Sequence, residues 1–172
     1  NNYTFKSPGI SNEWKFKITD PVANTIGFAL YAELGIKPHE LEFEAKVILD
    51  KRFGNFLWAF NTVGEYELKF KKSSTDNKTD IEHEYKWENV MGFTYLPTKN
   101  FSMGVEIRNQ NVIEENVLES SAFFIGPAIS YSTKTWWVAL TVLAQTVDFK
   151  KGSRDLEGHE KVEARLLFAF HL

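Results

Sequence analysis

Serine and histidine residues lie together in the polar segments between the most hydrophobic stretches of this sequence. The serines are Ser73, Ser74, Ser120, Ser121 and Ser153. His83 and His159 share these segments, and a histidine beside a serine is the base of a nucleophilic hydrolase or acyltransferase. No Gly-x-Ser-x-Gly motif accompanies any of the serines. We therefore expect no enzymatic activity, with a lipase-like or acyltransferase-like surface enzyme of the outer membrane as the alternative.

The same histidines have carboxylates nearby that could join them in binding a divalent ion. His83 stands between two glutamates, and His159 stands near Glu157 and Glu160. The sequence has no His-Glu-x-x-His motif and no Cys. The acidic loop residues also lack the spacing of a calcium-binding loop; they are Asp76, Asp80 and Asp155. We therefore expect no metal ion and no cofactor, and interpret these residues as solvated loop residues.

Alternation of apolar and charged residues is the dominant pattern of the chain. Between residues 41 and 47, Leu, Phe, Ala and Val alternate with Glu, Glu and Lys. Successive side chains of a β-strand point to opposite faces, so each such segment has one apolar and one charged face. Nine strands are predicted, separated by turn-forming residues: Glu13–Thr19, Thr25–Leu34, Glu40–Leu49, Phe56–Phe70, Glu84–Leu96, Phe101–Asn109, Ala122–Tyr131, Trp136–Val147 and Lys161–Leu172. The sequence predicts one all-β, antiparallel domain over residues 1–172.

The charged face of these strands is nearly balanced, with nine acidic and eight basic residues. We expect them to line the lumen of a β-barrel and to form ion pairs between strands. They are Glu13, Lys15, Lys17, Glu33, Glu42, Glu44, Lys46, Glu65, Glu67, Lys69, Lys86, Glu88, Glu106, Arg108, Lys161, Glu163 and Arg165. A solvated face with no role beyond closing the barrel is an equally good interpretation.

Alternation alone fits two architectures. A soluble barrel, such as a lipocalin-like carrier of apolar ligands, turns the apolar face inward, whereas a transmembrane barrel turns it toward lipid. Short connections at Lys51–Asn55, Pro97–Asn100 and Ser132–Thr135 alternate with longer ones, as in outer-membrane barrels. The longer connections are Lys71–His83, Gln110–Ser121 and Asp148–Glu160. The sequence therefore favours an antiparallel transmembrane β-barrel.

Two further features favour the membrane. Aromatic residues gather at both ends of the predicted strands, as in the aromatic girdles of membrane barrels. Phe53, Phe56, Tyr95 and Trp136 flank the short turns. The final segment alternates up to Leu172, much like the terminal strand that barrel-assembly machinery recognises.

Several stretches, in order along the chain, carry a family resemblance. They are Gly-Ile-Ser-Asn-Glu-Trp-Lys at 9–15, Gly-Phe-Ala-Leu-Tyr-Ala-Glu at 27–33, Lys-Val-Ile-Leu-Asp-Lys-Arg-Phe-Gly at 46–54, Gly-Pro at 126–127, the Trp-Trp segment at 136–145, and Glu-Ala-Arg-Leu-Leu-Phe at 163–168. Together they resemble a family of uncharacterised Gram-negative outer-membrane β-barrels, a domain of unknown function labelled porin-like or transporter. The resemblance implies fold and location, and no functional residues.

Members of that family begin with further strands, so we expect about three strands to precede this chain and about twelve in the full barrel, an even number as in bacterial barrels. The expected location is the bacterial outer membrane. The expected partners are outer-membrane lipid and the barrel-assembly machinery. With a net charge of −3 and no block of one sign, we expect no nucleic-acid binding. The expected function is a narrow, weakly selective channel of unidentified substrate, or a structural barrel.

Overall fold

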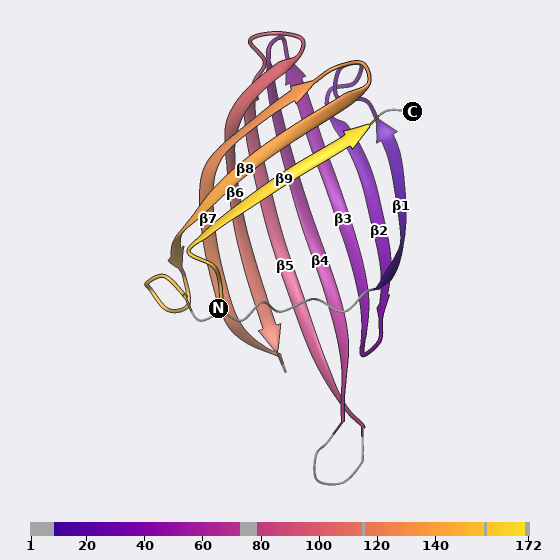
Figure 1. The fold of residues 1–172 in the computed structure, drawn as a ribbon, viewed down its shortest axis with the longest axis vertical. Coiled ribbons are helices and arrows are strands. Elements are labelled where there is room, and N and C mark those ends of the chain that lie inside the picture. The colour runs from indigo at the N-terminus through magenta and orange to yellow at the C-terminus, as the bar shows by residue number, and fades with distance from the viewer. Residues whose placement is uncertain (1–8, 73–78, 115, 157, 171–172) are drawn as a thin grey trace.

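The computed structural model describes residues 9–72, 79–114, 116–156 and 158–170. They form one nine-stranded antiparallel sheet in which each strand pairs with the next along the chain (Figure 1). The strands are β1 (Ile10–Thr19), β2 (Gly27–Lys37), β3 (Glu40–Phe53), β4 (Phe56–Lys72), β5 (Thr79–Tyr95), β6 (Phe101–Glu114), β7 (Val117–Ser132), β8 (Trp136–Asp148) and β9 (Val162–Phe170).

All nine predicted strands are present, and the antiparallel all-β prediction is confirmed. The predicted long polar loop at Gln110–Ser121 is wrong, since β6 and β7 continue to within two residues of each other. Asn116 adopts φ 65° in that connection. Val112 and Ile113 are consecutive apolar residues, as are Val117 and Leu118, and the register shifts between Val112 and Ile113. An irregularity of this kind interrupts the period-two alternation, which explains why the sequence pattern missed the strand ends.

Connections lie at two opposite ends of the sheet (Figure 1). The turn end holds residues 20–26, 54–55, 96–100 and 133–135. The loop end holds residues 38–39 and 116 and the described parts of the connection between β8 and β9, 149–156 and 158–161. The predicted long connection is therefore present between β8 and β9, whereas the connection between β6 and β7 is short.

The sheet curves into a half-barrel (Figure 1). Among the described residues, β1 pairs only with β2 and β9 only with β8. The strand number of the full protein stays a prediction. No described helix is long and apolar enough to cross a membrane.

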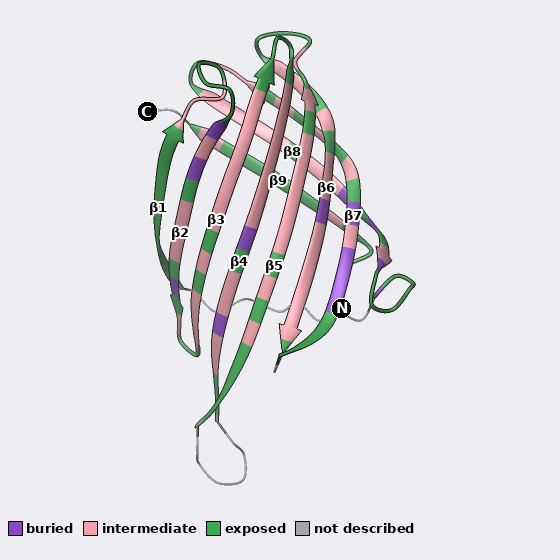
Figure 2. Cartoon of the chain, turned by 180° about the vertical axis from the view of Figure 1, so that it is seen from behind, coloured by how far each residue is buried: buried purple, intermediate pink, exposed green. Residues whose placement is uncertain are grey.

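Few of the described residues are buried (Figure 2). Many large apolar side chains lie on the surface. Phe16, Phe56 and Leu166 are each at least 60% exposed. The buried apolar cluster of the described residues consists of Ala122, Phe124 and Leu143, on β7 and β8. Among the described residues, large apolar side chains are therefore more often on the surface of the sheet than in a buried core.

Candidate functional site: the charged concave face

The strand register places the predicted charged residues on one face of the sheet. Glu44 pairs with Glu65, and Glu65 pairs in turn with Lys86. Paired residues of neighbouring strands point to the same side, and the alternation extends this relation along each strand. All of the predicted set lie within strands except Lys161, which immediately precedes β9. Their role in a lumen stays a prediction.

Ion pairs between β6 and β9 identify the charged face as the concave one. The Arg108 guanidinium donates to the Glu163 carboxylate, and Arg165 donates to Glu106. β6 and β9 are separated by β7 and β8 in the sheet. Side chains on strands so far apart can meet only across the hollow of a curved sheet, because on the outer side they diverge.

Arg108 is the most enclosed cation of this face, with 6% of its surface exposed. Its Nη1 lies 3.7 Å from the Glu88 carboxylate, and its guanidinium lies 4.8 Å from the centre of the Phe124 ring. A planar guanidinium can satisfy both a carboxylate and an aromatic face. Arg108 on β6 thus links three other strands, through Glu88 on β5, Phe124 on β7 and Glu163 on β9.

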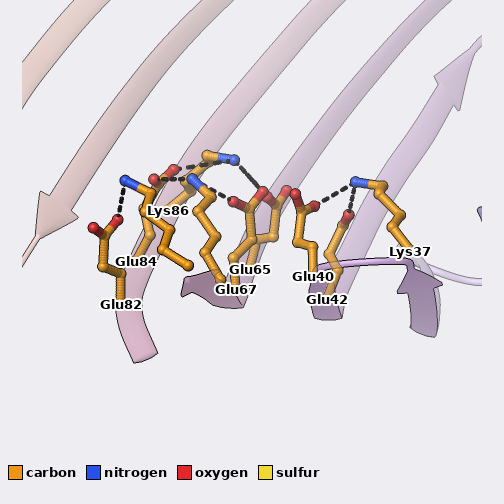
Figure 3. Close-up of polar contacts among 10 residues, drawn as sticks. Lys37, Glu40, Glu42, Glu65, Glu67, Glu82, Glu84 and Lys86 are labelled. Carbon is orange, nitrogen blue, oxygen red and sulfur yellow. Dashed lines mark hydrogen bonds and ion pairs between the residues drawn. The ribbon is translucent and has the colours of Figure 1, made fainter. Parts of the chain in front are cut away.

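A second ionic network crosses β2 to β5 near the loop end (Figure 3). Lys86 lies 2.8 Å from Glu65 and also donates to Glu67, which is almost completely buried. Lys69 lies 2.9 Å from Glu67 and donates to Glu84 as well. Lys86 Nζ also lies 3.3 Å from Glu84, so each lysine bridges carboxylates of β4 and β5, as the interleaved signs predicted.

Three carboxylates of this network come close enough to suggest an ion site. Oxygens of Glu40, Glu42 and Glu67 lie within 4.8 Å of one another. The Nζ of Lys37 lies 2.5 Å from a carboxylate oxygen of Glu40 and 2.9 Å from one of Glu42. The Nζ of Lys69 lies 2.9 Å from a carboxylate oxygen of Glu67. Because lysines already neutralise these carboxylates, we interpret them as structural.

The convex face is apolar and carries two bands of aromatic rings. At the turn end, the ring centres of Phe56 and Tyr95 lie 5.0 Å apart, and Trp136 lies 5.7 Å from Tyr131. Toward the loop end, the rings of Tyr66 and Tyr85 stack at 4.7 Å. Between the bands, the described outward-facing residues of β3 to β6 are uncharged except Lys51, which lies one register step inside Phe53 and donates to the backbone oxygen of Asn24.

A polar cluster occupies the concave side at the loop end. Ser120 Oγ and His159 Nε2 form a hydrogen bond of 2.9 Å. Carboxylate oxygens of Asp148 and Asp155 and a ring nitrogen of His159 lie within 4.8 Å of one another. A cavity of about 480 Å³ adjoins Ser120, Asp155 and His159.

A family model matches residues 1–172, which is the whole chain. The chain belongs to DUF6662, a family of unknown function. No curated protein and no solved structure matches the chain. The predicted membership of a domain family of unknown function is thereby confirmed, while the family description names neither a location nor an activity.

Sequence reasoning found only part of the polar cluster in this DUF6662 chain. It named Ser120, His159 and Asp155 but gave Asp148 no role and passed over Gln145. The reason is a β-bulge: Phe123 pairs with Val147 and Phe124 with Gln145, which leaves Thr146 without a partner. The extra residue shifts the alternation of the side chains between the two faces of the strand. Gln145 and Asp148 therefore point to the same face, and both are fully buried.

Among the described candidates of the DUF6662 chain, Ser153 accepts a hydrogen bond from the amide of Asp148 through its backbone oxygen, whereas His83 is kept apart from its neighbouring glutamates. His83 is bonded through Nδ1 to the Tyr66 hydroxyl at 2.7 Å, on the convex face, whereas Glu82 and Glu84 lie on the concave one. Ser73, Ser74, Asp76 and Glu157 lie outside the described residues.

Proposed function

We propose that this protein is a transmembrane β-barrel of the bacterial outer membrane, with lipid around its convex face and charged side chains in its lumen. The observation that carries the proposal is the pairing of an apolar, ring-banded convex face with an ion-paired concave face. In an aqueous protein such an exposed apolar surface would be a large aggregation hazard. In a bilayer it is the surface that lipid requires.

The spacing of the two aromatic bands fits a membrane. Phe56 and Tyr66 are ten residues apart on β4, which is about 33 Å along a strand at about 3.3 Å per residue. Barrel strands tilt by about 35–45°, so the bands stand roughly 23–27 Å apart along the membrane normal, close to the height of about 25 Å of the apolar band of outer-membrane barrels. Amphipathic rings at both membrane–water interfaces would hold the barrel at a fixed depth in the bilayer.

The strands reach beyond that band at the loop end. β4 and β5 each have 17 residues, whereas about 9–11 residues suffice to cross the bilayer. The networks around Glu67, Lys69 and Glu84 lie in this extension. We therefore place the loop end outside the cell and the turn end in the periplasm, as short periplasmic turns require.

The lumen supports a narrow, weakly selective channel or a structural barrel better than an open pore. Arg108 and Lys86 carry long side chains that reach across the concave face to partners on other strands. The bore of a barrel widens with strand number, from filled eight-stranded barrels to open porins. Paired long side chains would occlude much of that bore and present no single sign of charge to an ion.

A surface hydrolase is the second candidate, and the Ser120–His159 hydrogen bond is the observation in its favour. The amide that would follow the nucleophile in an oxyanion site is that of Ser121. It donates instead to Asp148 Oδ2 at 2.8 Å. Because that donor is already engaged, we propose a non-enzymatic protein.

The chain contains no Cys, so single cysteines can carry a fluorophore to either face. The label is attached to Val105→Cys or Leu140→Cys, and the protein is folded into phosphatidylcholine vesicles. Brominated acyl chains should then strongly quench the fluorescence of the label. Glu106→Cys, on the concave face next to Val105, is the matched control and should be quenched weakly. Equal quenching on both faces, or a monodisperse protein without detergent, would overturn the membrane proposal and favour a lipocalin-like carrier.

A further inference from the structure

The polar cluster at the loop end concentrates buried negative charge. Asp148 is 0% exposed and Asp155 is 3% exposed. One oxygen from each carboxylate lies within 4.8 Å of the other and of a nitrogen of His159. Burying two carboxylates side by side is costly unless cations neutralise them. Lys151 Nζ lies 2.7 Å from Asp155 Oδ1, and the amide of Gly158 donates to the same oxygen at 3.0 Å.

Asp148 is held by backbone amides. Its Oδ1 accepts hydrogen bonds from the amides of Lys150 and Lys151, at 2.8 and 2.9 Å, and its Oδ2 accepts one from the amide of Ser121. These bonds fix the orientation of the carboxylate and place one of its oxygens toward Asp155 and His159. A carboxylate positioned in this way by its surroundings is typical of a metal ligand.

Gln145 supplies an independent observation. Its side chain is 0% exposed. Its Nε2 donates to the backbone oxygen of Asp155 at 3.1 Å. Its Oε1 is buried with no hydrogen-bond partner among the described residues. Both atoms belong to one amide, so the orphaned acceptor lies on the group that contacts the backbone of Asp155. A buried acceptor without a donor is costly, and a cation is the partner that removes the cost.

His159 is also oriented as a ligand. Its Nε2 is bonded to Ser120 Oγ, and its ring packs edge-on against Phe124 with 5.9 Å between the ring centres. When Nε2–H donates to the hydroxyl, Nδ1 carries the lone pair that a metal binds. The cavity of about 480 Å³ that adjoins His159 and Asp155 gives an ion a route from the loop end.

We propose that Asp148, Asp155 and the Nδ1 of His159, with the amide oxygen of Gln145, bind one divalent transition-metal ion such as Zn²⁺ or Mn²⁺. A set of carboxylates with one imidazole suits these ions, whereas Ca²⁺ and Mg²⁺ take oxygen ligands. The ion joins the connection 149–161 to β7 and β8. Its role is structural, with no catalytic step.

Calorimetric titration of the chelator-treated, tag-free protein with Zn²⁺ tests the site. One equivalent should bind, and binding should be lost in His159→Gln and in Asp155→Asn. His83→Gln, a histidine at the same end on the opposite face, is the matched control and should bind as the wild type does. Ser120→Ala should weaken binding by about 10–100-fold, as expected for a residue that orients a ligand.

A second measurement needs no variant and so remains decisive if substitutions disturb folding. The Mn²⁺ complex of the wild-type protein should show the nitrogen hyperfine coupling of one imidazole in pulsed electron paramagnetic resonance. The proposal is overturned if that coupling is absent, if Zn²⁺ does not bind, if His159→Gln binds Zn²⁺ normally, or if Ca²⁺ binds and Zn²⁺ does not. Labelling of Ser120 by a serine-directed probe, abolished in His159→Gln, would assign the cluster to a nucleophile instead.

Discussion

Arg108 on β6 donates a hydrogen bond to Glu163 on β9, across two intervening strands. This contact exists only because the sheet curves, and it identifies the side that holds the charges. A flat sheet would keep these side chains too far apart to meet. The pair therefore links the charge pattern of the sequence to the curvature of the fold.

Replacing Arg108 by Ala should strongly destabilise the protein. Its removal leaves the Glu88 and Glu163 carboxylates without their partner in an enclosed place, which should cost roughly 3–5 kcal/mol. Arg165→Ala is the matched control, since the Arg165 side chain is 44% exposed and exposed pairs contribute about 1 kcal/mol or less. Equilibrium unfolding in urea, in the presence of lipid, measures both. Equal losses would contradict the special role of Arg108.

Charge on the convex face should be costly if that face contacts lipid. Val105→Arg or Leu140→Arg should each cost about 2–4 kcal/mol if the position lies near the bilayer midplane. Glu106→Gln, on the concave face, should cost much less. The same unfolding assay in vesicles measures the three variants, and similar costs on the two faces would mean that inside and outside are assigned wrongly.

Asp20 should make stability depend on acid pH. The carboxylate accepts hydrogen bonds from Lys17 and from the amides of Val22 and Ala23 in the turn. These bonds lower the pKa of Asp20 from 3.8 to about 2. The pKa of Asp20 is lower in the folded state than in the unfolded state. The ionised carboxylate therefore stabilises the fold at pH values above 3.8, and this stabilisation is lost as the pH falls through about 2.

Wild-type protein should therefore melt at a higher temperature than Asp20→Asn at neutral pH. The difference should shrink between the two pKa values and vanish below the lower one. Thermal melting monitored by circular dichroism across this range is the measurement. A difference that persists unchanged in strong acid would exclude the carboxylate as its source.

Gly126 should not tolerate a side chain. A Cβ at this position would lie 1.8 Å from the Val142 backbone oxygen on the neighbouring strand. Overpacking of this kind typically costs about 1–3 kcal/mol, and here the obstacle is backbone rather than a flexible side chain. Gly64→Ala is the control, because nothing lies within 4 Å of its added Cβ. Thermal melting of the two variants should separate them clearly.

Conductance should be small. The balanced concave face, nine acidic and eight basic residues in the predicted set, offers no excess of one sign to select ions. The side chains of Lys86 and Arg108 occupy space that an open pore would need. Planar-bilayer recording of the whole protein tests this expectation. A large, steady and strongly ion-selective conductance would contradict it.

The sequence alone predicted all nine strands, since alternation with period two is a local property that each strand displays by itself. It also predicted which residues share a face, because neighbours in register must point to the same side. Strand ends were missed at Gln110–Ser121, where a register shift between Val112 and Ile113 interrupts the alternation.

The tertiary structure decided what no local pattern contains. Whether the charged face is concave depends on the sense of the sheet's curvature, a property of the whole sheet that the Arg108–Glu163 contact reveals. The polar cluster likewise required the fold. Ser120 and His159 are 39 residues apart in the chain. The bulge at Thr146 turns Gln145 and Asp148 to the same side. Long-range pairing and one extra residue in a strand determine that site, and neither follows from periodicity.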